Sequence, residues 1–282
     1  MTIPIYENLT AIDGTVIRAA RLDPEGAAAG VVQIVHGFGE SIIHYVEIMK
    51  FFVENGYACV IHDQRGHGEM AGLIPKEKLV ALGFGPGYEY FLYDVKVVRD
   101  MITRLYPQLP VILYGHSMGG NIAVNYLFKH SQGQHQKVIL ESPWFRLYKP
   151  IPRSTLAVAE LLGGLSFNIA PIAKLRKDDI FRNSEIIKSL ERDDIYQNRV
   201  SFRLISQICE AGELAIKNAG LITIPTLLLC PASDKIVCPN ATREFARRAG
   251  ENVSKIEYPD GYHALRYDDV RDDVLADIGK FL

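Results

Sequence analysis

The sequence predicts an α/β fold in which helices flank a mostly parallel central sheet and a helical cap is inserted between two of its strands. Three observations support this prediction. Short apolar runs alternate with longer stretches of helical spacing, and one long helical stretch interrupts the alternation. In addition, one serine stands among glycines at a point where a strand would pass into a helix.

The first predicted element is a hairpin at the edge of the sheet. Tyr6–Ala11 and Thr15–Arg21 are strand-like and flank Asp13-Gly14, a pair typical of tight turns. Alternating elements follow, with strands expected at Val31–Val35, Ala58–His62, Val111–Tyr114, Val138–Leu140 and Thr226–Cys230, and helices at Tyr45–Asn55, Tyr88–Leu105, Met118–His130 and Asn240–Ala249. This order builds parallel strands that are covered by helices on both faces.

The alternation stops after Ser142-Pro143. From Trp144 to about Gly220 the spacing is helical, and no strand pattern appears until after this stretch. An insertion of this length between two strands is expected to lie over the carboxyl edge of the sheet. We therefore predict a helical cap at residues 144–220, on a core formed by residues 1–143 and 221–282.

The composition supports one large core and excludes some classes of partner. Of the 282 residues, 48% are hydrophobic and the net charge is −2, so there is no electrostatic reason to expect a nucleic-acid ligand. The sequence has no basic and apolar leader and no run of about 18 apolar residues, so we expect a cytoplasmic protein without a transmembrane helix. The four cysteines form no CxxC pair, and buried free thiols are expected at Cys59 and Cys230, which lie in apolar runs. The oligomeric state is not predicted.

Ser117 is the candidate nucleophile. It follows a predicted strand and precedes a predicted helix, which is the setting of the G-x-S-x-G elbow that holds a serine hydroxyl above a sheet. Gly115 and Gly119 would leave space where side chains collide in such a turn, and Gly120 would let the helix approach the sheet. A glycine-rich helix entry is the plain alternative, but the strand-to-helix position favours the nucleophile.

A serine nucleophile needs a base that is oriented by an acid, and in such elbows the chain order is serine, acid, histidine. Of the eight histidines, only His263 follows the cap, in a loop before the last predicted helix. Asp234 lies in a loop after the strand Thr226–Cys230 and is the predicted acid. Asp260 competes but is too close to His263 along the chain, and Asp268 and Asp269 are interpreted as residues at the start of the last helix.

Backbone N–H groups are needed to stabilise the oxyanion of an acyl-transfer reaction. One predicted donor is Met118, the residue after the nucleophile. The other is Phe38, in the turn His36–Glu40 that follows the strand Val31–Val35. An ordinary turn is the alternative, and its position directly after this strand favours the oxyanion role.

At this point the motifs resemble a known family. IVHGFGE, HDQRGHG, YGHSMGG, PASDKIV and YPDGYHAL together look like the monoacylglycerol lipase and lysophospholipase group of the α/β-hydrolase superfamily, which is also grouped with serine aminopeptidase-like hydrolases. The resemblance spans nearly the whole chain. It implies an α/β-hydrolase fold, the triad Ser117, Asp234 and His263, oxyanion donors at Phe38 and Met118, no cofactor, and a cap that shapes an acyl-binding tunnel.

The chain departs from this group at two places. A serine and then a glycine usually follow the RGHG block, whereas Glu69-Met70 stand here, and Ser41 takes the place of the histidine that normally follows HGxGE. The cap also has no stretch that matches the group. These departures concern the substrate more than the chemistry.

A metal site is a weaker interpretation of the histidines near the strand ends. No HExxH or comparable ligand spacing occurs, so no metal is expected. We interpret the segment containing Asp63, Arg65 and His67 as a hydrogen-bonded loop that braces the oxyanion turn. The apolar segment 154–173 either packs the cap onto the core or lines a tunnel and touches lipid aggregates.

The function expected from these residues is a serine hydrolase that cleaves carboxylic esters of lipid-like acyl groups, of the monoacylglycerol or lysophospholipid type. A small-ester or aryl-ester hydrolase, or a peptidase, is the alternative within the fold. A carboxylate that binds a free amine, at Glu160 or Glu210, would favour the peptidase. A binding protein without activity is disfavoured, because serine, acid and histidine occur in the required order.

Overall fold

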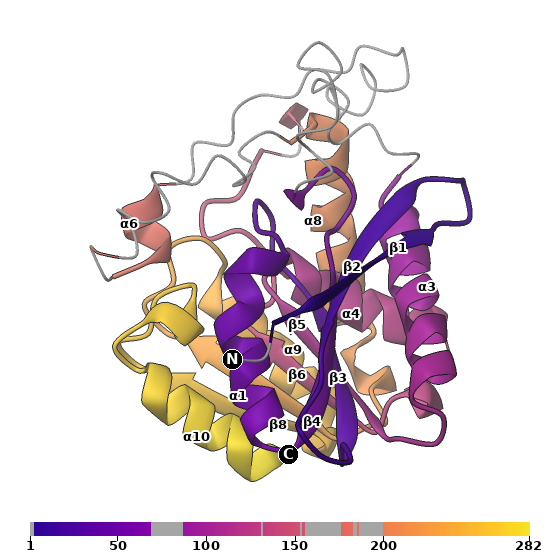
Figure 1. The fold of residues 1–282 in the computed structure, drawn as a ribbon. Helices are drawn as coiled ribbons and strands as arrows, with labels where there is room; N and C mark the ends of the chain where they lie inside the picture. The colour runs from indigo at the N-terminus through magenta and orange to yellow at the C-terminus, as the bar shows by residue number, and fades with distance from the viewer. Residues whose placement is uncertain are drawn as a thin grey trace.

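In the computed structural model, residues 3–68, 87–130, 132–152, 154–155, 176–182, 185 and 200–282 are described (Figure 1). Within them, one sheet has eight strands in the order β1-β2-β4-β3-β5-β6-β7-β8. The first two pairings, β1 with β2 and β2 with β4, are antiparallel, and all the others are parallel. The strands are β1 Ile5–Thr10, β2 Val16–Leu22, β3 Gly30–Val35, β4 Tyr57–His62, β5 Val111–His116, β6 Lys137–Glu141, β7 Thr226–Pro231 and β8 Val253–Tyr258.

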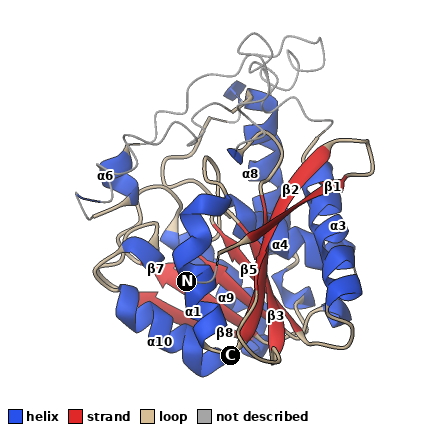
Figure 2. Cartoon of the chain, in the orientation of Figure 1, coloured by secondary structure: helices blue, strands red, loops and turns tan. Residues whose placement is uncertain are grey.

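Helices cover both faces of this sheet (Figure 2). One apolar core joins the sheet to α1 and α10, and another joins the opposite face to α3, α4, α8 and α9. The helices are α1 Val46–Glu54, α3 Glu89–Leu105, α4 Met118–Lys129, α6 Lys177–Ile180, α8 Phe202–Lys217, α9 Pro239–Ala249 and α10 Arg271–Phe281. Short 3-10 turns are η1 Ile42–Tyr45, η3 Gln132–Gln134, η4 Ala219–Leu221, η5 Gly250–Asn252 and η6 Leu265–Tyr267.

The predicted sheet is confirmed strand by strand. Every residue of β3, β5 and β7 is buried, because helices exclude water from both faces, and this explains their continuous apolar runs. The predicted hairpin is also confirmed, with β1 at the edge of the sheet. None of the described helices combines the length and the apolar character that crossing a bilayer requires.

One boundary predicted from the sequence is wrong. Asp268 and Asp269 were expected to open the last helix, but α10 begins at Arg271. Asp268 is buried instead, and its Oδ2 accepts a hydrogen bond from the Tyr262 backbone N–H at 2.6 Å. The carboxylate therefore closes the loop that contains His263 rather than capping a helix.

The predicted cap is described only in part. Within residues 144–220 the structure gives α6 and α8, and α8 packs against α4 and α9. A Cβ on Gly212 would lie 2.0 Å from the Phe145 carbonyl oxygen, so α8 sits directly on the segment after β6. The apolar segment 156–173, Glu160, Glu69 and Met70 lie outside the described residues. The cap and its boundaries stay a prediction.

Candidate active site

Ser117 occupies a strained turn between β5 and α4. Its φ of 53° and ψ of −118° are rare for a residue with a side chain. A Cβ on Gly119 would lie 2.0 Å from the Val35 carbonyl oxygen, and one on Gly115 would lie 2.7 Å from the Gly119 carbonyl oxygen. The glycines are therefore required because α4 begins in direct contact with the ends of β3 and β5.

The structure brings Ser117, His263 and Asp234 together, although they come from three separate loops. The Nε2 of His263 lies 2.9 Å from the Oγ of Ser117, and its Nδ1 lies 2.7 Å from the Oδ2 of Asp234. The other carboxylate oxygen of Asp234 accepts the backbone N–H groups of Ile236 at 2.7 Å and Val237 at 2.9 Å. All three side chains are buried, so this chain of hydrogen bonds is shielded from water.

Asp260, the competing acid, does not join this arrangement. It is exposed, and the acid contact with His263 comes from Asp234. Asp260 contributes its backbone carbonyl, which accepts a hydrogen bond from Arg182. Asp234 rather than Asp260 therefore lies beside His263, and its role as the acid stays a prediction.

Ser142 is a residue of the site that the sequence did not reveal. Its Oγ donates a hydrogen bond of 2.7 Å to the backbone carbonyl of His263, which fixes the loop that carries the imidazole. Its φ is 47°, a left-handed conformation that disfavours residues other than glycine. The sequence gives no signal for this conformation. Positions with positive φ are usually recognised by a glycine, and here the residue is a serine.

The turn predicted to supply an oxyanion donor lies against the nucleophile. A Cβ on Gly37 would lie 3.3 Å from the Cβ of Ser117, and the Gly37 N–H donates to Glu40 Oε2 at 2.8 Å. Within the described part of the chain, no hydrogen bond uses the backbone N–H of Phe38 or of Met118. Both groups are thus available to a developing oxyanion beside Ser117.

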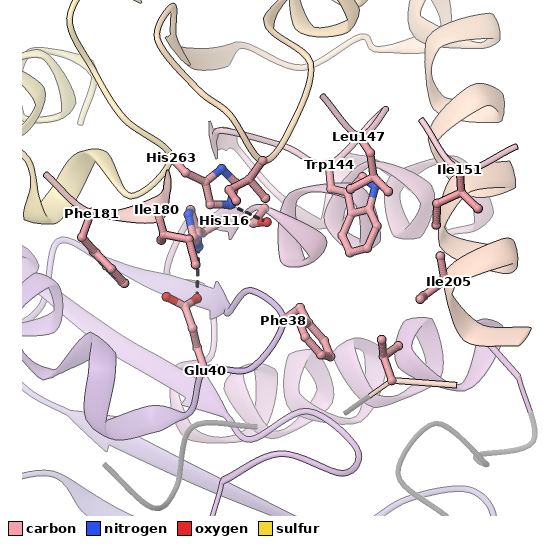
Figure 3. Close-up of a pocket in the computed structure, with 13 residues that line it drawn as sticks. Phe38, Glu40, His116, Trp144, Leu147, Ile151, Ile180, Phe181, Ile205 and His263 are labelled. Carbon is pink, nitrogen blue, oxygen red and sulfur yellow. Dashed lines mark hydrogen bonds and ion pairs between the residues drawn. The ribbon is translucent and has the colours of Figure 1, made fainter. Parts of the chain in front are cut away.

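A cavity of about 120 Å³ opens at Ser117 (Figure 3). Trp144, Leu147, Ile151 and Ile205 lie on one side of His263, and Ile180 and Phe181 lie on the other. The described lining consists of Phe38, Glu40, His116, Ser117, Trp144, Leu147, Ile151, Ile180, Phe181, Val200, Ile205, Ile236 and His263. Because most of these side chains are apolar, the cavity suits an apolar group next to a reactive serine.

A family model described as serine aminopeptidase, S33, matches residues 26–269. The chain belongs to this family. A monoacylglycerol lipase of Mycolicibacterium smegmatis is 26% identical over 261 residues, covering 92% of this chain and 90% of that protein. An uncharacterised abhydrolase domain-containing protein of Dictyostelium discoideum is 26% identical over 248 residues, or 88% of this chain, but the chain spans only 25% of that protein's length.

A solved structure with a similar fold is also a monoglyceride lipase. A soluble variant of monoglyceride lipase from Saccharomyces cerevisiae, crystallised with a substrate analog, has a TM-score of 0.84 at 22% identity, covering 100% of this chain and 95% of that chain. The predicted α/β-hydrolase fold and the resemblance to the monoacylglycerol lipase group are confirmed.

In this member of the S33 family, two of the histidines near the strand ends, His36 and His67, have hydrogen-bond partners within the protein. The Gln64 N–H donates to His36 Nε2 at 2.8 Å, and His67 Nδ1 lies 2.9 Å from the Arg65 carbonyl oxygen. Burial lowers the pKa of His62 and of His67 to about 4, so both are neutral at pH 7. No group of three or more potential metal ligands occurs in the described ranges.

The loop between β4 and residue 68 is hydrogen-bonded to the turn His36–Glu40 and to the residues after it, and the oxyanion role of this turn stays a prediction. Asp63 Oδ1 accepts the backbone N–H of Ile42 at 2.8 Å, just after the turn. Arg65 donates to Asp94 of α3 at 2.7 Å and to Asp13 of the hairpin turn at 2.7 Å. This loop therefore ties the turn to two other elements of the fold.

Proposed function

We propose that this chain hydrolyses carboxylic esters with lipid-like acyl groups, of the monoacylglycerol or lysophospholipid type, through an acyl-enzyme on Ser117. One observation carries the proposal. The hydroxyl of Ser117 lies 2.9 Å from His263 Nε2 at the base of an apolar cavity. The S33 family and the monoacylglycerol lipase among the relatives place the chain among carboxylic-ester hydrolases.

In the proposed first half-reaction, Ser117 Oγ attacks the ester carbonyl while His263 Nε2 takes the hydroxyl proton. Asp234 holds the imidazole through Nδ1 and stabilises its charged form at 2.7 Å. The N–H groups of Phe38 and Met118 donate to the oxyanion. The protonated imidazole then gives its proton to the leaving alcohol, and the acyl group stays on Ser117.

In the second half-reaction water takes the place of the alcohol. His263 accepts a proton from the water as it attacks the acyl carbonyl, and then returns a proton to Ser117 Oγ as the carboxylic acid leaves. No cofactor takes part in this scheme. The site needs only the two polar contacts of the imidazole and the two backbone donors.

The apolar lining supports a lipid-like acyl group. Each methylene that leaves water contributes about 0.8 kcal/mol, so binding should strengthen with acyl length until the cavity and the cap are filled. The apolar cap segment 154–173, which we propose as the contact with lipid aggregates, extends outside the described residues. The cytoplasmic location predicted from the sequence stays a prediction.

The peptidase alternative has less support from the described part of the site. Among the described residues that line the cavity, Glu40 is the only one with a carboxylate, and Arg266 already pairs with it. Glu210 is exposed on α8 and does not line the cavity. A free amino group therefore finds no unpaired carboxylate among the described lining residues.

A series of p-nitrophenyl esters from acetate to palmitate, each below its micelle threshold, tests this proposal. We expect kcat/KM to rise from acetate to medium chains, and Ser117→Ala to abolish both hydrolysis and fluorophosphonate labelling. A steep maximum at acetate or propionate would leave a small-ester hydrolase. Cleavage of aminoacyl naphthylamides in preference to every ester would favour the peptidase.

A further inference from the structure

A buried ion cluster lies next to the proposed triad. The Arg266 guanidinium pairs through one nitrogen with Glu40 Oε1, and another nitrogen lies 3.4 and 3.5 Å from the two carboxylate oxygens of Glu141. Its carbon lies 4.3 Å from the ring centroid of Tyr45 and 4.9 Å from that of Tyr267. All three charged side chains are at most 7% exposed, so water does not screen them.

The members of this cluster are charged despite their burial. Burial opposes ionisation of Glu40, but the charge of Arg266 outweighs it and holds the pKa of Glu40 well below its usual range. The same balance of burial against Arg266 lowers the pKa of Glu141. The carboxylates of Glu40 and Glu141 therefore share the guanidinium of Arg266, and the three side chains together carry a net charge of −1.

Glu40 connects the cluster to the oxyanion turn. Its Oε2 accepts the Gly37 N–H at 2.8 Å and the Tyr45 hydroxyl at 2.6 Å, and lies 3.1 Å from His116 Nδ1. The bond from Gly37 fixes the His36–Gly37 peptide, which is one residue before the peptide that carries the Phe38 N–H. The position of the Phe38 N–H relative to Ser117 therefore depends on where Glu40 is held.

The other two members connect the cluster to the nucleophile and to the base. Glu141 ends β6, and its backbone carbonyl accepts the Ser117 N–H at 3.0 Å. Arg266 follows His263 by three positions, and its own backbone N–H lies 3.3 Å from Glu141 Oε1. One guanidinium thus connects three parts of the site. These are the turn that contains Phe38, the end of β6 beside Ser117, and the loop that carries the His263 imidazole.

We propose that Arg266 is a positioning residue, which sets the placement of the oxyanion turn at Phe38 relative to Ser117 and His263. This inference rests on the proposed function. Arg266 does not line the cavity, so it acts through Glu40 and Glu141 and makes no contact with substrate. A displacement of about 1 Å between a donor and the reacting atoms costs about 10²-fold in rate.

A cycle of two substitutions separates positioning from charge balance. Arg266→Met leaves two buried carboxylates without a counter-charge, so it should lower both stability and kcat. Glu40→Gln removes one of them. The double variant has the same net charge in the cluster as the wild type, one negative charge on Glu141, but has lost the link between the loops. It should therefore recover part of the thermal stability that Arg266→Met loses, because one buried carboxylate is left without a counter-charge instead of two, while its kcat stays about 10²-fold low.

The rate is measured per active site, counted by fluorophosphonate titration, so that unfolded protein does not lower it. We expect KM to change by less than about threefold, and a trifluoromethyl ketone that mimics the tetrahedral intermediate to lose affinity in parallel with kcat/KM. A purely structural role would lower the titrated fraction and leave the rate of each titrated site unchanged. Arg243→Met, which breaks a partly exposed ion pair with Glu257 outside the cluster, is the matched control and should stay within twofold.

If the double variant regains a kcat within threefold of the wild type, charge balance explains the effect and the proposal is wrong. If that variant does not fold, Arg266→Lys decides the question, because it keeps the charge and loses the planar fork. It should lower kcat at least tenfold per titrated site, and a change under twofold contradicts the proposal. If the wild type cleaves no ester but is labelled at Ser117, the proposed function fails, and the labelling rate of each variant still tests Arg266.

Discussion

Replacing Gly119 by alanine changes the stability of the fold in two opposite ways, one through the helix itself and one through its contacts with the neighbouring strand. Gly119 lies in the first turn of α4, and alanine stabilises a helix by up to about 1 kcal/mol relative to glycine. Its Cβ, however, would lie 2.0 Å from the Val35 carbonyl oxygen and 2.5 Å from that of His36. Since both atoms are backbone, the end of β3 or the start of α4 has to move.

The size of the movement follows from the contact. Real Cβ atoms essentially never approach a heavy atom closer than 3.0 Å, so the gap must open by about 1 Å. Overpacking of this kind costs about 1–3 kcal/mol, which exceeds the helix gain. The displaced segment leads into the turn at Phe38, so activity should fall about 10²-fold as well.

Gly279→Ala is the control, because it is the same substitution in another helix. A Cβ on Gly279 of α10 would meet only the Phe51 ring at 3.9 Å, an ordinary contact. Urea unfolding should show Gly279→Ala equal to or more stable than the wild type and Gly119→Ala less stable, with ester hydrolysis lost only in the second. Equal stability of the two variants, with Gly119→Ala more than half active, would refute the elbow geometry.

The remaining predictions concern the triad, metal and pH. Ser117→Ala, Asp234→Asn and His263→Ala should each lower kcat by about 10⁴-fold or more, and Asp260→Asn should not; the reverse result for the two aspartates would overturn the assignment of the acid. Dialysis against a chelator should leave ester hydrolysis unchanged. Burial lowers the pKa of His135 to about 3, against about 6.5 in an unfolded chain, so the folded state binds fewer protons and stability is lost as pH falls below about 6.5. Between pH 6.5 and 5 this contributes up to about 2 kcal/mol, and urea unfolding of His135→Gln should show a smaller loss.

The fold was predictable where burial or strain leaves a pattern in neighbouring residues. The strand at Val31–Val35 is apolar without alternation because both of its faces are covered. The turn at Ser117 requires glycines at fixed spacing, and these stand out in the sequence. The chain order of acid and histidine then narrowed the candidates to Asp234 and His263, which the structure places in contact with each other.

The rest was hidden because it depends on residues far apart in the chain. Arg266 and Glu40 are 226 positions apart, and in a sequence each looks like an ordinary surface charge. Ser142 combines a left-handed backbone with a hydrogen bond to the His263 loop, and no local sequence pattern shows that long-range contact. Asp268 was misread because an aspartate before a helix usually caps it, whereas here the Tyr262 N–H competes for the carboxylate.

The distribution of the site along the chain has a consequence for protein synthesis. Ser117 and His263 are 146 positions apart, and a ribosome adds about 5–20 residues per second. The nucleophile is therefore made roughly 7 to 30 seconds before the base that would activate it. Strands β1 to β5 are complete when Ser117 has been made, and β6 follows within the next 24 residues, but β7 and β8, whose ends lead to Asp234 and His263, come much later. Under the proposed mechanism, the serine of a nascent chain is therefore inactive. Ester hydrolysis can begin only after β8 has been made and has joined the sheet, because the loop after β8 carries His263.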